Sequence, residues 1–349
     1  MRGVVFTGDR TLELMSFPDP EPGPYEVVLA IRASGMCGSD LKFYRPPAGA
    51  AFKALGLRDT GEPIIAGHEP AGEVIAVGRD VDPRMARVGM RAMVYHYDGC
   101  HACPSCRTGW WQMCDNGPVT YGLNGHGGHA PYMKVPARTL VPLPEELSFA
   151  TGAAISCGTG TAYQALVRAD VSARDTVAVF GQGPVGLSAT QLAAALGAQV
   201  IAVDISGERA QRALQFGAIH AIDASTTDPV EEIMALTGGR GVGKAFDTSG
   251  VAAGRLGAVQ SCGKWGTACF VGEGGDVTFN VSPDIMRKQL TIIGSWTFSN
   301  VGQGQCTNFI ADHGVEVDRL FTDRWSFAQA DEAYRDFDHQ LGGKAVFIQ

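Results

Sequence analysis

The sequence predicts an α/β protein with two domains, in which one domain is split by the insertion of the other. Residues 1–150 consist of short apolar runs between Pro and Gly clusters, which is typical of a β-rich domain. From residue 151 to about 294, apolar strands alternate with helical patterns, and residues 295–349 return to a mixed pattern. A chain of 349 residues is long enough for two ordinary domains.

In the β-rich part, residues 26–31, 71–77 and 90–95 are the clearest strands. The middle part begins with a buried strand at 176–180, and a helix, a strand and a second helix follow at 185–196, 199–203 and 206–216. Such alternation predicts a parallel, doubly wound sheet with helices on its faces. The chain closes with a short apolar strand at 345–348.

Composition excludes several function classes. The chain has 28 basic and 36 acidic residues, a net charge of −8, and no basic arm, so nucleic acid and anionic membranes are poor partners. No stretch reaches the ~18 consecutive apolar residues of a membrane span. Charges interrupt residues 1–10, where a signal peptide needs an apolar run. We therefore expect a cytoplasmic protein without a membrane partner.

A glycine-rich turn follows the first strand of the middle part and opens its first helix. It reads Gly181-Gln182-Gly183-Pro184-Val185-Gly186. Gly181 permits the tight turn, Gly183 lets a pyrophosphate approach the backbone, and Gly186 packs the helix onto the strand. The pattern alone is a weak signal, but the flanking strand and helix strengthen it. We expect Pro184 and Val185 to belong to the same dinucleotide site.

Asp204 ends the next strand. Its carboxylate accepts hydrogen bonds from ribose hydroxyls and repels a 2′-phosphate, which predicts NAD rather than NADP. Arg209, five residues later, is a second candidate for the same ribose. The alternative for Arg209 is a solvated charge on a helix.

Four cysteines lie close together in the sequence. Cys100, Cys103, Cys106 and Cys114 are spaced 3, 3 and 8 residues apart, in a lobe at about 96–116. Four thiolates enclose one Zn²⁺ ion tetrahedrally and leave no open position, so this pattern predicts a structural zinc site. Disulfides are the alternative, which a reducing cytoplasm disfavours. His101 is a possible substitute ligand.

Three further segments carry Cys37, His68 with Glu69, and Cys157. Each is unremarkable alone, since a free Cys is usually a small core residue and a His beside Gly is often a turn residue.

The order of these motifs over essentially the whole chain resembles the zinc-containing medium-chain alcohol dehydrogenases. The matching parts are the Cys-Gly-Ser-Asp segment 37–40, the Gly-His-Glu turn 67–69, the four-cysteine lobe, the turn-and-strand segment 125–132, the fingerprint 181–186 with Asp204, and residues 343–346. The resemblance implies a GroES-like catalytic domain, split into residues 1–150 and 295–349, and a Rossmann coenzyme domain at 151–294.

The resemblance also implies a catalytic zinc held by Cys37, His68 and Cys157. At the third position polyol dehydrogenases more often have Glu. Glu69 corresponds to the family's alternate ligand, which exchanges with water during turnover. Two thiolates and an imidazole leave one open position, where Zn²⁺ acts as a Lewis acid on a substrate oxygen.

Several neighbouring residues acquire roles from the same resemblance. Asp40 corresponds to the carboxylate that holds the ring of His68 from behind the metal, and Ser39 to the hydroxyl that takes the alcohol proton. Thr161 corresponds to a residue near the nicotinamide. The alternatives are turn residues for Asp40 and Ser39 and a helix-interior residue for Thr161.

Three features depart from the family pattern. Lys42 stands where relatives commonly have a proton-relaying His, and it is either an outer relay group or a solvated surface charge. His96 replaces a large aromatic residue of the substrate pocket, which favours an oxygenated substrate. The segment 45–61, between the Cys and His segments, is longer than expected for the family, and we expect it to rim the substrate pocket.

The leading hypothesis is a zinc-dependent alcohol dehydrogenase, with two zinc ions per subunit and NAD. It would transfer hydride reversibly from a primary or secondary alcohol, such as a polyol or diol, and give an aldehyde or ketone. The alternatives are a zinc-free quinone or enoyl reductase, which lacks both ligand sets, and a non-catalytic dinucleotide- or zinc-binding protein, which would lose a ligand. The resemblance implies a homo-oligomer, a dimer or tetramer, that binds a small alcohol or carbonyl substrate.

Overall fold

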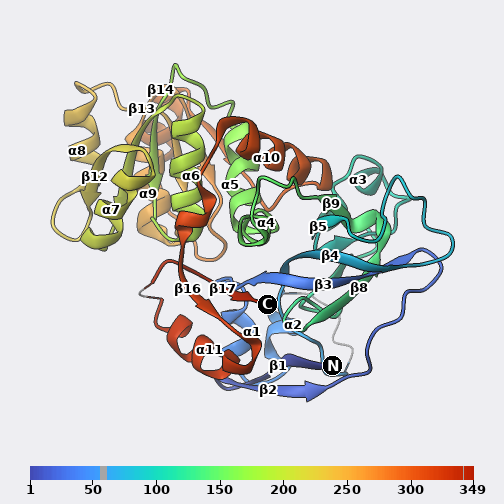
Figure 1. Cartoon of the computed structure of the whole chain (residues 1–349). Coiled ribbons are helices and arrows are strands. Elements are labelled where there is room, and N and C mark those ends of the chain that lie inside the picture. Colours follow the sequence, from blue (N-terminus) through green and yellow to red (C-terminus); the bar gives the residue numbers. More distant parts are fainter. Residues whose placement is uncertain (56–60, 341) are drawn as a thin grey trace. The chain divides into compact units, whose positions relative to one another are not determined.

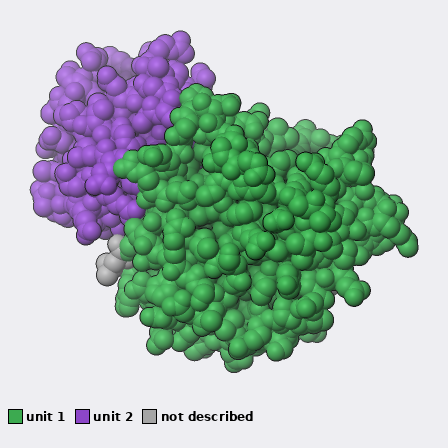
Figure 2. All heavy atoms as spheres, viewed as in Figure 1, with its two compact units in different colours: residues 1–157, 298–349 green, residues 158–297 purple. Residues whose placement is uncertain are grey.

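The computed structural model describes residues 1–55, 61–340 and 342–349. It divides the chain into two compact units (Figure 2): unit 1 contains residues 1–157 and 298–349, and unit 2 contains residues 158–297. The first boundary between the units therefore lies after residue 157, seven residues later than the expected boundary at 150. The reason is that helix α4 (Phe149–Ile155) packs against strands of unit 1 and belongs to that unit.

Unit 1 is built on a seven-stranded sheet with the order β16-β17-β3-β4-β5-β9, in which β8 pairs with β3 (Figure 1). The strands are β3 (Glu26–Gly35), β4 (Glu69–Val77), β5 (Arg91–Val94), β8 (Tyr132–Pro136), β9 (Leu140–Pro142), β16 (Phe321–Trp325) and β17 (Lys344–Ile348). The last two come from the C-terminal segment, and β17 pairs with the end of β3. Residues far apart in sequence therefore meet where β3 ends.

The remaining elements of unit 1 are smaller. The described residues of unit 1 also form two antiparallel strand pairs and six α-helices: β1 (Arg2–Gly8) with β2 (Thr11–Ser16), β6 (Tyr97–Asp98) with β7 (Val119–Thr120), α1 (Leu41–Tyr44), α2 (Ala50–Leu55), α3 (Pro104–Arg107), α4, α10 (Asn300–His313) and α11 (Ala330–Asp338). The expected pocket rim at 45–61 contains α2, and its residues 56–60 lie outside the described residues.

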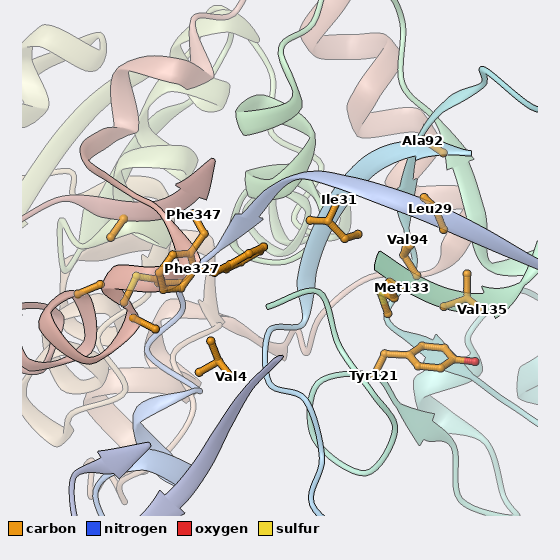
Figure 3. Close-up of a cluster of buried hydrophobic side chains, with 14 of the residues drawn as sticks. Val4, Leu29, Ile31, Ala92, Val94, Tyr121, Met133, Val135, Phe327 and Phe347 are labelled. Atoms are coloured by element: carbon orange, nitrogen blue, oxygen red, sulfur yellow. The ribbon is translucent and has the colours of Figure 1, made fainter. Parts of the chain in front are cut away.

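A cluster of buried apolar side chains fills the space beside this sheet (Figure 3). Leu29 and Ile31 of β3, Val94 of β5 and Met133 and Val135 of β8 are all at most 2% exposed. Burial of each such side chain contributes about 1.5–3 kcal/mol. Leu29 and Ile31 are two residues apart on β3 and therefore point to the same face of the sheet, where they pack into this cluster.

Unit 2 has a six-stranded parallel sheet with the order β12-β11-β10-β13-β14-β15. Its elements are α5 (Gly158–Arg168), β10 (Thr176–Phe180), α6 (Pro184–Ala195), β11 (Gln199–Asp204), α7 (Gly207–Ala213), β12 (Ala218–Asp223), α8 (Pro229–Leu236), β13 (Val242–Asp247), α9 (Ala252–Ser261), β14 (Cys262–Phe270) and β15 (Thr291–Gly294). The chain starts at the central strand β10 and winds outward on both sides, which confirms the predicted doubly wound fold.

The predicted elements differ from the observed ones mainly at their ends. Strand β3 runs four residues beyond the predicted end at residue 31, because its continuation pairs with β17. Helix α7 ends at Ala213, and a 3₁₀ turn (Leu214–Phe216) completes the predicted helix before Gly217, whose φ of 95° stops it. Within the described ranges, no helix combines the length and apolar character that crossing a membrane requires.

Candidate active site

The segment that follows β3 is folded around the side chain of Asp40. Its Oδ2 accepts a hydrogen bond from the backbone N–H of Cys37 at 2.8 Å, and this closes the turn before α1. Asp40 is fully buried, whereas Cys37 and Ser39 are partly exposed. The turn brings the Ser39 hydroxyl to 3.3 Å from the sulfur of Cys37.

Two glycines allow the second segment to approach the first. Gly67 has a φ of +92°, and a Cβ there would lie 2.3 Å from Nδ1 of His129. A Cβ on Gly35 would lie 2.0 Å from a carboxylate oxygen of Glu69. A side chain at position 67 would therefore displace the ring of His129, and one at position 35 would displace the carboxylate of Glu69, the first residue of β4.

Cys157 lies between α4 and α5 and brings a third segment to the site. Its sulfur is 4.0 Å from that of Cys37. One ligand atom each from Cys37, His68, Glu69 and Cys157 lie within 4.8 Å of one another. The structure thus brings together the three ligands and the alternate ligand that the sequence analysis expects.

The orientation of His68 leaves one ring nitrogen for a metal. Nδ1 lies 2.9 Å from Oδ1 of Asp40, and both side chains are almost completely buried. Nε2 is then the nitrogen on the side of the two cysteines. A carboxylate behind the ring is the usual arrangement for a histidine that binds a metal.

The charges around this cluster favour a cation. Burial alone would lower the pKa of His68, but Asp40 and Cys37 outweigh it and raise this pKa well above its usual value. A hydrogen bond from Cys157 lowers the pKa of Cys37 well below that of a free thiol. Two thiols, an imidazole and a carboxylate at this spacing are a donor set that fits Zn²⁺.

Lys344 is a member of this site that the sequence analysis did not assign a role. Its Nζ lies 2.5 Å from Oε2 of Glu69, and the two side chains are 3% and 0% exposed. Burial raises the pKa of Glu69 to about 8, although the charge of Lys344 acts in the opposite direction. The signal in the sequence was a lysine at the start of an otherwise apolar final strand.

The second donor cluster lies in the lobe between β6 and β7. The sulfurs of Cys100, Cys103, Cys106 and Cys114 lie within 4.8 Å of one another. Backbone N–H groups, that of Ala102 foremost, lower the pKa of the Cys100 thiol to about 6. Four sulfur donors with this spacing fit a closed, tetrahedral zinc site.

Side chains around the lobe hold its loop in place. The indole N–H of Trp111 donates to the carbonyl oxygen of Cys106 at 3.1 Å. His101 adopts a φ of 57°, and its Nε2 lies 2.7 Å from Oδ1 of Asp98, which also accepts from Arg138. His101 therefore braces the loop, and it is not among the four grouped donors.

The glycines of the fingerprint in unit 2 occupy three different environments. Gly181 has a φ of +89°, and a Cβ on Gly186 would lie 1.8 Å from the carbonyl oxygen of Gly181. Around Gly183 a Cβ would meet no atom within 4 Å. Gly183 precedes α6, whose first residues are Pro184 and Val185. The amino-terminal end of α6 therefore has accessible backbone, as binding of a pyrophosphate requires.

Asp204 lies at the edge of a cavity of about 490 Å³ beside this turn. Its carboxylate accepts from the backbone N–H groups of Gln182 at 2.6 Å and Ser206 at 2.8 Å. Gly181, Gly183 and Arg209 line the same cavity. The structure thus groups Asp204 and Arg209 with the fingerprint. Thr161 lies on α5, half-buried, and does not line this cavity.

Comparisons with known proteins agree with this architecture. The sequence-family model of the alcohol dehydrogenase GroES-like domain matches residues 23–145, and the family model of zinc-binding dehydrogenases matches residues 184–312. An uncharacterised zinc-type alcohol dehydrogenase-like protein of Escherichia coli is 39% identical over 99% of this chain and 98% of its own. Sorbitol dehydrogenase of Bacillus subtilis is 30% identical, with 95% and 92% covered. The crystal structure of galactitol-1-phosphate dehydrogenase from Escherichia coli has a TM-score of 0.88 and 28% identity, with both chains fully covered.

The two matched domains and the dehydrogenases among the relatives identify the class of protein as an oxidoreductase. The chain belongs to the zinc-containing medium-chain alcohol dehydrogenase family.

Proposed function

We propose that this chain is a zinc- and NAD-dependent dehydrogenase that oxidises a primary or secondary alcohol, such as a polyol or diol, reversibly to an aldehyde or ketone. The observation that carries the proposal is the donor cluster of Cys37, His68 and Cys157 beside the Ser39 hydroxyl. Zinc bound by these three residues supplies Lewis-acid polarisation of a substrate oxygen. The chain then has to orient the alcohol, take its proton and hold the nucleotide.

Ser39 is the proposed acceptor of the alcohol proton. Its hydroxyl adjoins the cluster, and the turn built on Asp40 fixes its position. Lys42 lies one helical turn further, half-buried on α1, and its backbone N–H donates to the carbonyl oxygen of Ser39 at 3.1 Å. We assign Lys42 to the outer end of the proton path, where it meets solvent.

NAD is the proposed oxidant because of Asp204. A carboxylate at this edge of the cavity accepts from the ribose hydroxyls, whereas a 2′-phosphate would meet its negative charge. Arg209 lines the same cavity and is assigned to the ribose as well. Thr161 is assigned to the nicotinamide side by its place in the family pattern. NAD, when held by these residues, would supply the nicotinamide that accepts hydride from the alcohol carbon.

A hydroxylated substrate is supported by His96. Burial lowers the pKa of His96 to about 3, so that its ring is neutral. Nδ1 lies 2.8 Å from the carbonyl oxygen of Ser156 and therefore carries the hydrogen, which leaves Nε2 as an acceptor. The ring centres of His96 and His68 are 5.3 Å apart. The relatives named sorbitol dehydrogenase and galactitol-1-phosphate dehydrogenase also favour a polyol.

The proposed protein is a dimer or tetramer of identical chains in the cytoplasm. Strand β15 ends the sheet of unit 2 with β14 as its only neighbour among the described strands, and a second copy can extend the sheet there. Two thiol clusters need a reducing compartment to stay free of disulfides. The assigned partner is the small alcohol or carbonyl substrate, with neither nucleic acid nor a membrane.

The alternatives explain fewer of these features. A zinc-free quinone or enoyl reductase has no use for either donor cluster. A non-catalytic zinc- or dinucleotide-binding protein would not require Ser39 beside an open metal position.

Absorbance of NADH during incubation with a panel of polyols, diols and simple alcohols tests the proposal. We expect NADH formation that is lost in Cys37→Ser and kept in Cys269→Ala, which removes a buried thiol outside both clusters. An inactive wild-type enzyme with bound zinc and bound NAD would contradict the proposal, provided that the panel includes the matching carbonyl compounds with NADH.

A further inference from the structure

A buried chain of hydrogen bonds leads away from Asp40 on the side opposite to His68. The hydroxyl of Tyr334 on α11 lies 3.0 Å from Oδ2 of Asp40. Nε2 of His129 lies 2.7 Å from that hydroxyl, and Nδ1 of His129 lies 2.7 Å from Oγ of Ser34 on β3. All four of these side chains are 0% exposed. Three distant parts of unit 1 thus converge on one carboxylate.

The chemistry of the groups fixes the direction of each hydrogen bond. A carboxylate only accepts, so Tyr334 donates its single hydrogen to Asp40. The tyrosine oxygen must then accept from Nε2–H of His129, and Nδ1 of His129 accepts from the Ser34 hydroxyl. Burial lowers the pKa of His129 to about 4, and burial together with Asp40 raises that of Tyr334 well above its usual value. Both groups are therefore neutral, as this pattern requires.

Every donor in this chain points toward Asp40. Its Oδ2 receives hydrogen bonds from Cys37 N–H and from Tyr334, and its Oδ1 faces Nδ1 of His68. Loss of the Tyr334 hydroxyl would remove one of the two donors to Oδ2, and only the backbone N–H of Cys37 would still hold this oxygen, so the carboxylate could tilt. Because Asp40 sets the ring of His68, such a rotation would move Nε2 relative to Cys37 and Cys157.

Packing alone does not account for the Tyr334 hydroxyl. Tyr334 also lies in an aromatic group, with ring centres 4.9 Å from Phe6 and 5.6 Å from Tyr44. Tyr44 is 1% exposed in the same group, and its hydroxyl has no hydrogen-bond partner among the described residues. The two tyrosines share their apolar surroundings, and they differ in what their hydroxyl groups contact.

We propose that Tyr334 and His129 are positioning residues for the catalytic metal site. They act through Asp40 on His68 and hold its imidazole in the orientation in which it binds zinc. This inference rests on the proposed function, because it assumes that Cys37, His68 and Cys157 bind zinc. It extends the site to α11 and to the loop that precedes β8, which contribute no ligand.

The test compares Tyr334→Phe with Tyr44→Phe. Each variant removes one buried hydroxyl, and the second is the matched control. Zinc affinity is measured by competition with a chelator, and the catalytic ion is identified as the one that Cys37→Ser loses. We expect Tyr334→Phe to bind this zinc up to about 10-fold more weakly, the lower end of the ~10–100-fold loss that follows removal of a metal ligand's direct partner, because Tyr334 acts through Asp40. Tyr44→Phe should match the wild type, and the four-cysteine zinc should be unaffected in both variants.

Two further readouts separate positioning from loss of structure. The visible spectrum of cobalt-substituted protein should change in Tyr334→Phe and not in Tyr44→Phe, because ligand geometry changes only in the first. His129→Leu should weaken zinc binding less than Tyr334→Phe, since the bond from Tyr334 to Asp40 remains. Unfolding midpoints of the same samples show whether each variant is folded.

Equal zinc affinity and equal cobalt spectra in folded Tyr334→Phe and Tyr44→Phe would overturn the inference and leave the proposed function intact. A wild-type protein without a zinc ion that depends on Cys37 would overturn both, and it is recognised before any tyrosine variant is made.

Discussion

Nζ of Lys344, the first residue of β17, lies 2.5 Å from Oε2 of Glu69, the first residue of β4, and both side chains are buried. This ion pair joins the C-terminal strand to the segment that carries His68. Lys344 also donates to the carbonyl oxygen of Met36 at 3.3 Å, directly before Cys37. The end of the chain thus helps to hold two segments of the metal site.

Lys344→Met should destabilise the protein strongly. Above pH ~8, where Glu69 is ionised, the change leaves its carboxylate buried without its counter-charge, which typically costs about 3–5 kcal/mol. The double variant Lys344→Met with Glu69→Gln should recover much of this loss, because no unpaired charge remains. Urea unfolding gives the free energies, and Arg84→Met, which breaks an exposed pair with Asp82, is the control with little expected change. A single variant as stable as the control would contradict this role of Lys344.

The two zinc clusters differ in how much of them the sequence predicts. Cys100, Cys103, Cys106 and Cys114 lie within 15 consecutive residues, so their spacing alone predicts a shared metal. Cys37, His68 and Cys157 meet only because β3, β4 and α4 pack together, and family resemblance was needed to group them. The glycines at 181, 183 and 186 also lie close together in the sequence, so their motif could be recognised from spacing. The structure gives them three distinct environments.

Tyr334, His129 and the partner of Glu69 were not predicted. Tyr334 and Lys344 join the site from the C-terminal segment, and His129 joins it from the loop before β8 through contacts with Ser34 and Tyr334. A sequence pattern carries no signal for these contacts. The division into units after Cys157 differs from the expected boundary at 150 for a similar reason, because a sequence pattern does not tell which unit α4 packs against.

Asp204→Ser should narrow the preference for NAD over NADP. When NADP binds to the wild type, the carboxylate repels the 2′-phosphate and loses its hydrogen bonds to the ribose. Together these effects cost several kcal/mol. Each ~1.4 kcal/mol changes the preference tenfold. The ratio of kcat/KM for the two coenzymes is the measurement, and Asp228→Ser, at the same cavity, is the control. Equal use of both coenzymes by the wild type would show that Asp204 does not select the coenzyme.

Ser39→Ala should lower kcat by roughly 10²–10⁴, the contribution of a positioned proton transfer. Lys42→Ala should have a smaller effect on kcat, because water replaces the outer end of the path, but it should shift the pH–rate profile. Rates with a deuterated substrate show whether hydride transfer limits turnover. A fully active Ser39→Ala would exclude the proton path, and an unchanged profile in Lys42→Ala would leave that lysine as a surface charge.

His129 makes folding sensitive to acid. Its pKa is about 4 in the folded protein because of burial, against about 6.5 in an unfolded chain. Between these values the unfolded state binds a proton that the folded state refuses, so stability falls as the pH falls, by roughly 3 kcal/mol in all. In His129→Leu this part of the pH dependence should disappear, and in His313→Leu, at an exposed position, it should persist. The measurement is the free energy of unfolding as a function of pH. If its pH dependence were the same in His129→Leu and the wild type, His129 would not be the source of the acid sensitivity.

Zinc content per subunit, measured together with NADH formation in wild type and Cys37→Ser, tests the central claim most directly. Cys103→Ser serves as the comparison, because it should chiefly lower thermal stability. We predict two zinc ions in the wild type, and one zinc ion with no turnover in a folded Cys37→Ser. Undiminished zinc content and activity in Cys37→Ser would contradict the assignment of Cys37, His68 and Cys157 as the catalytic metal site.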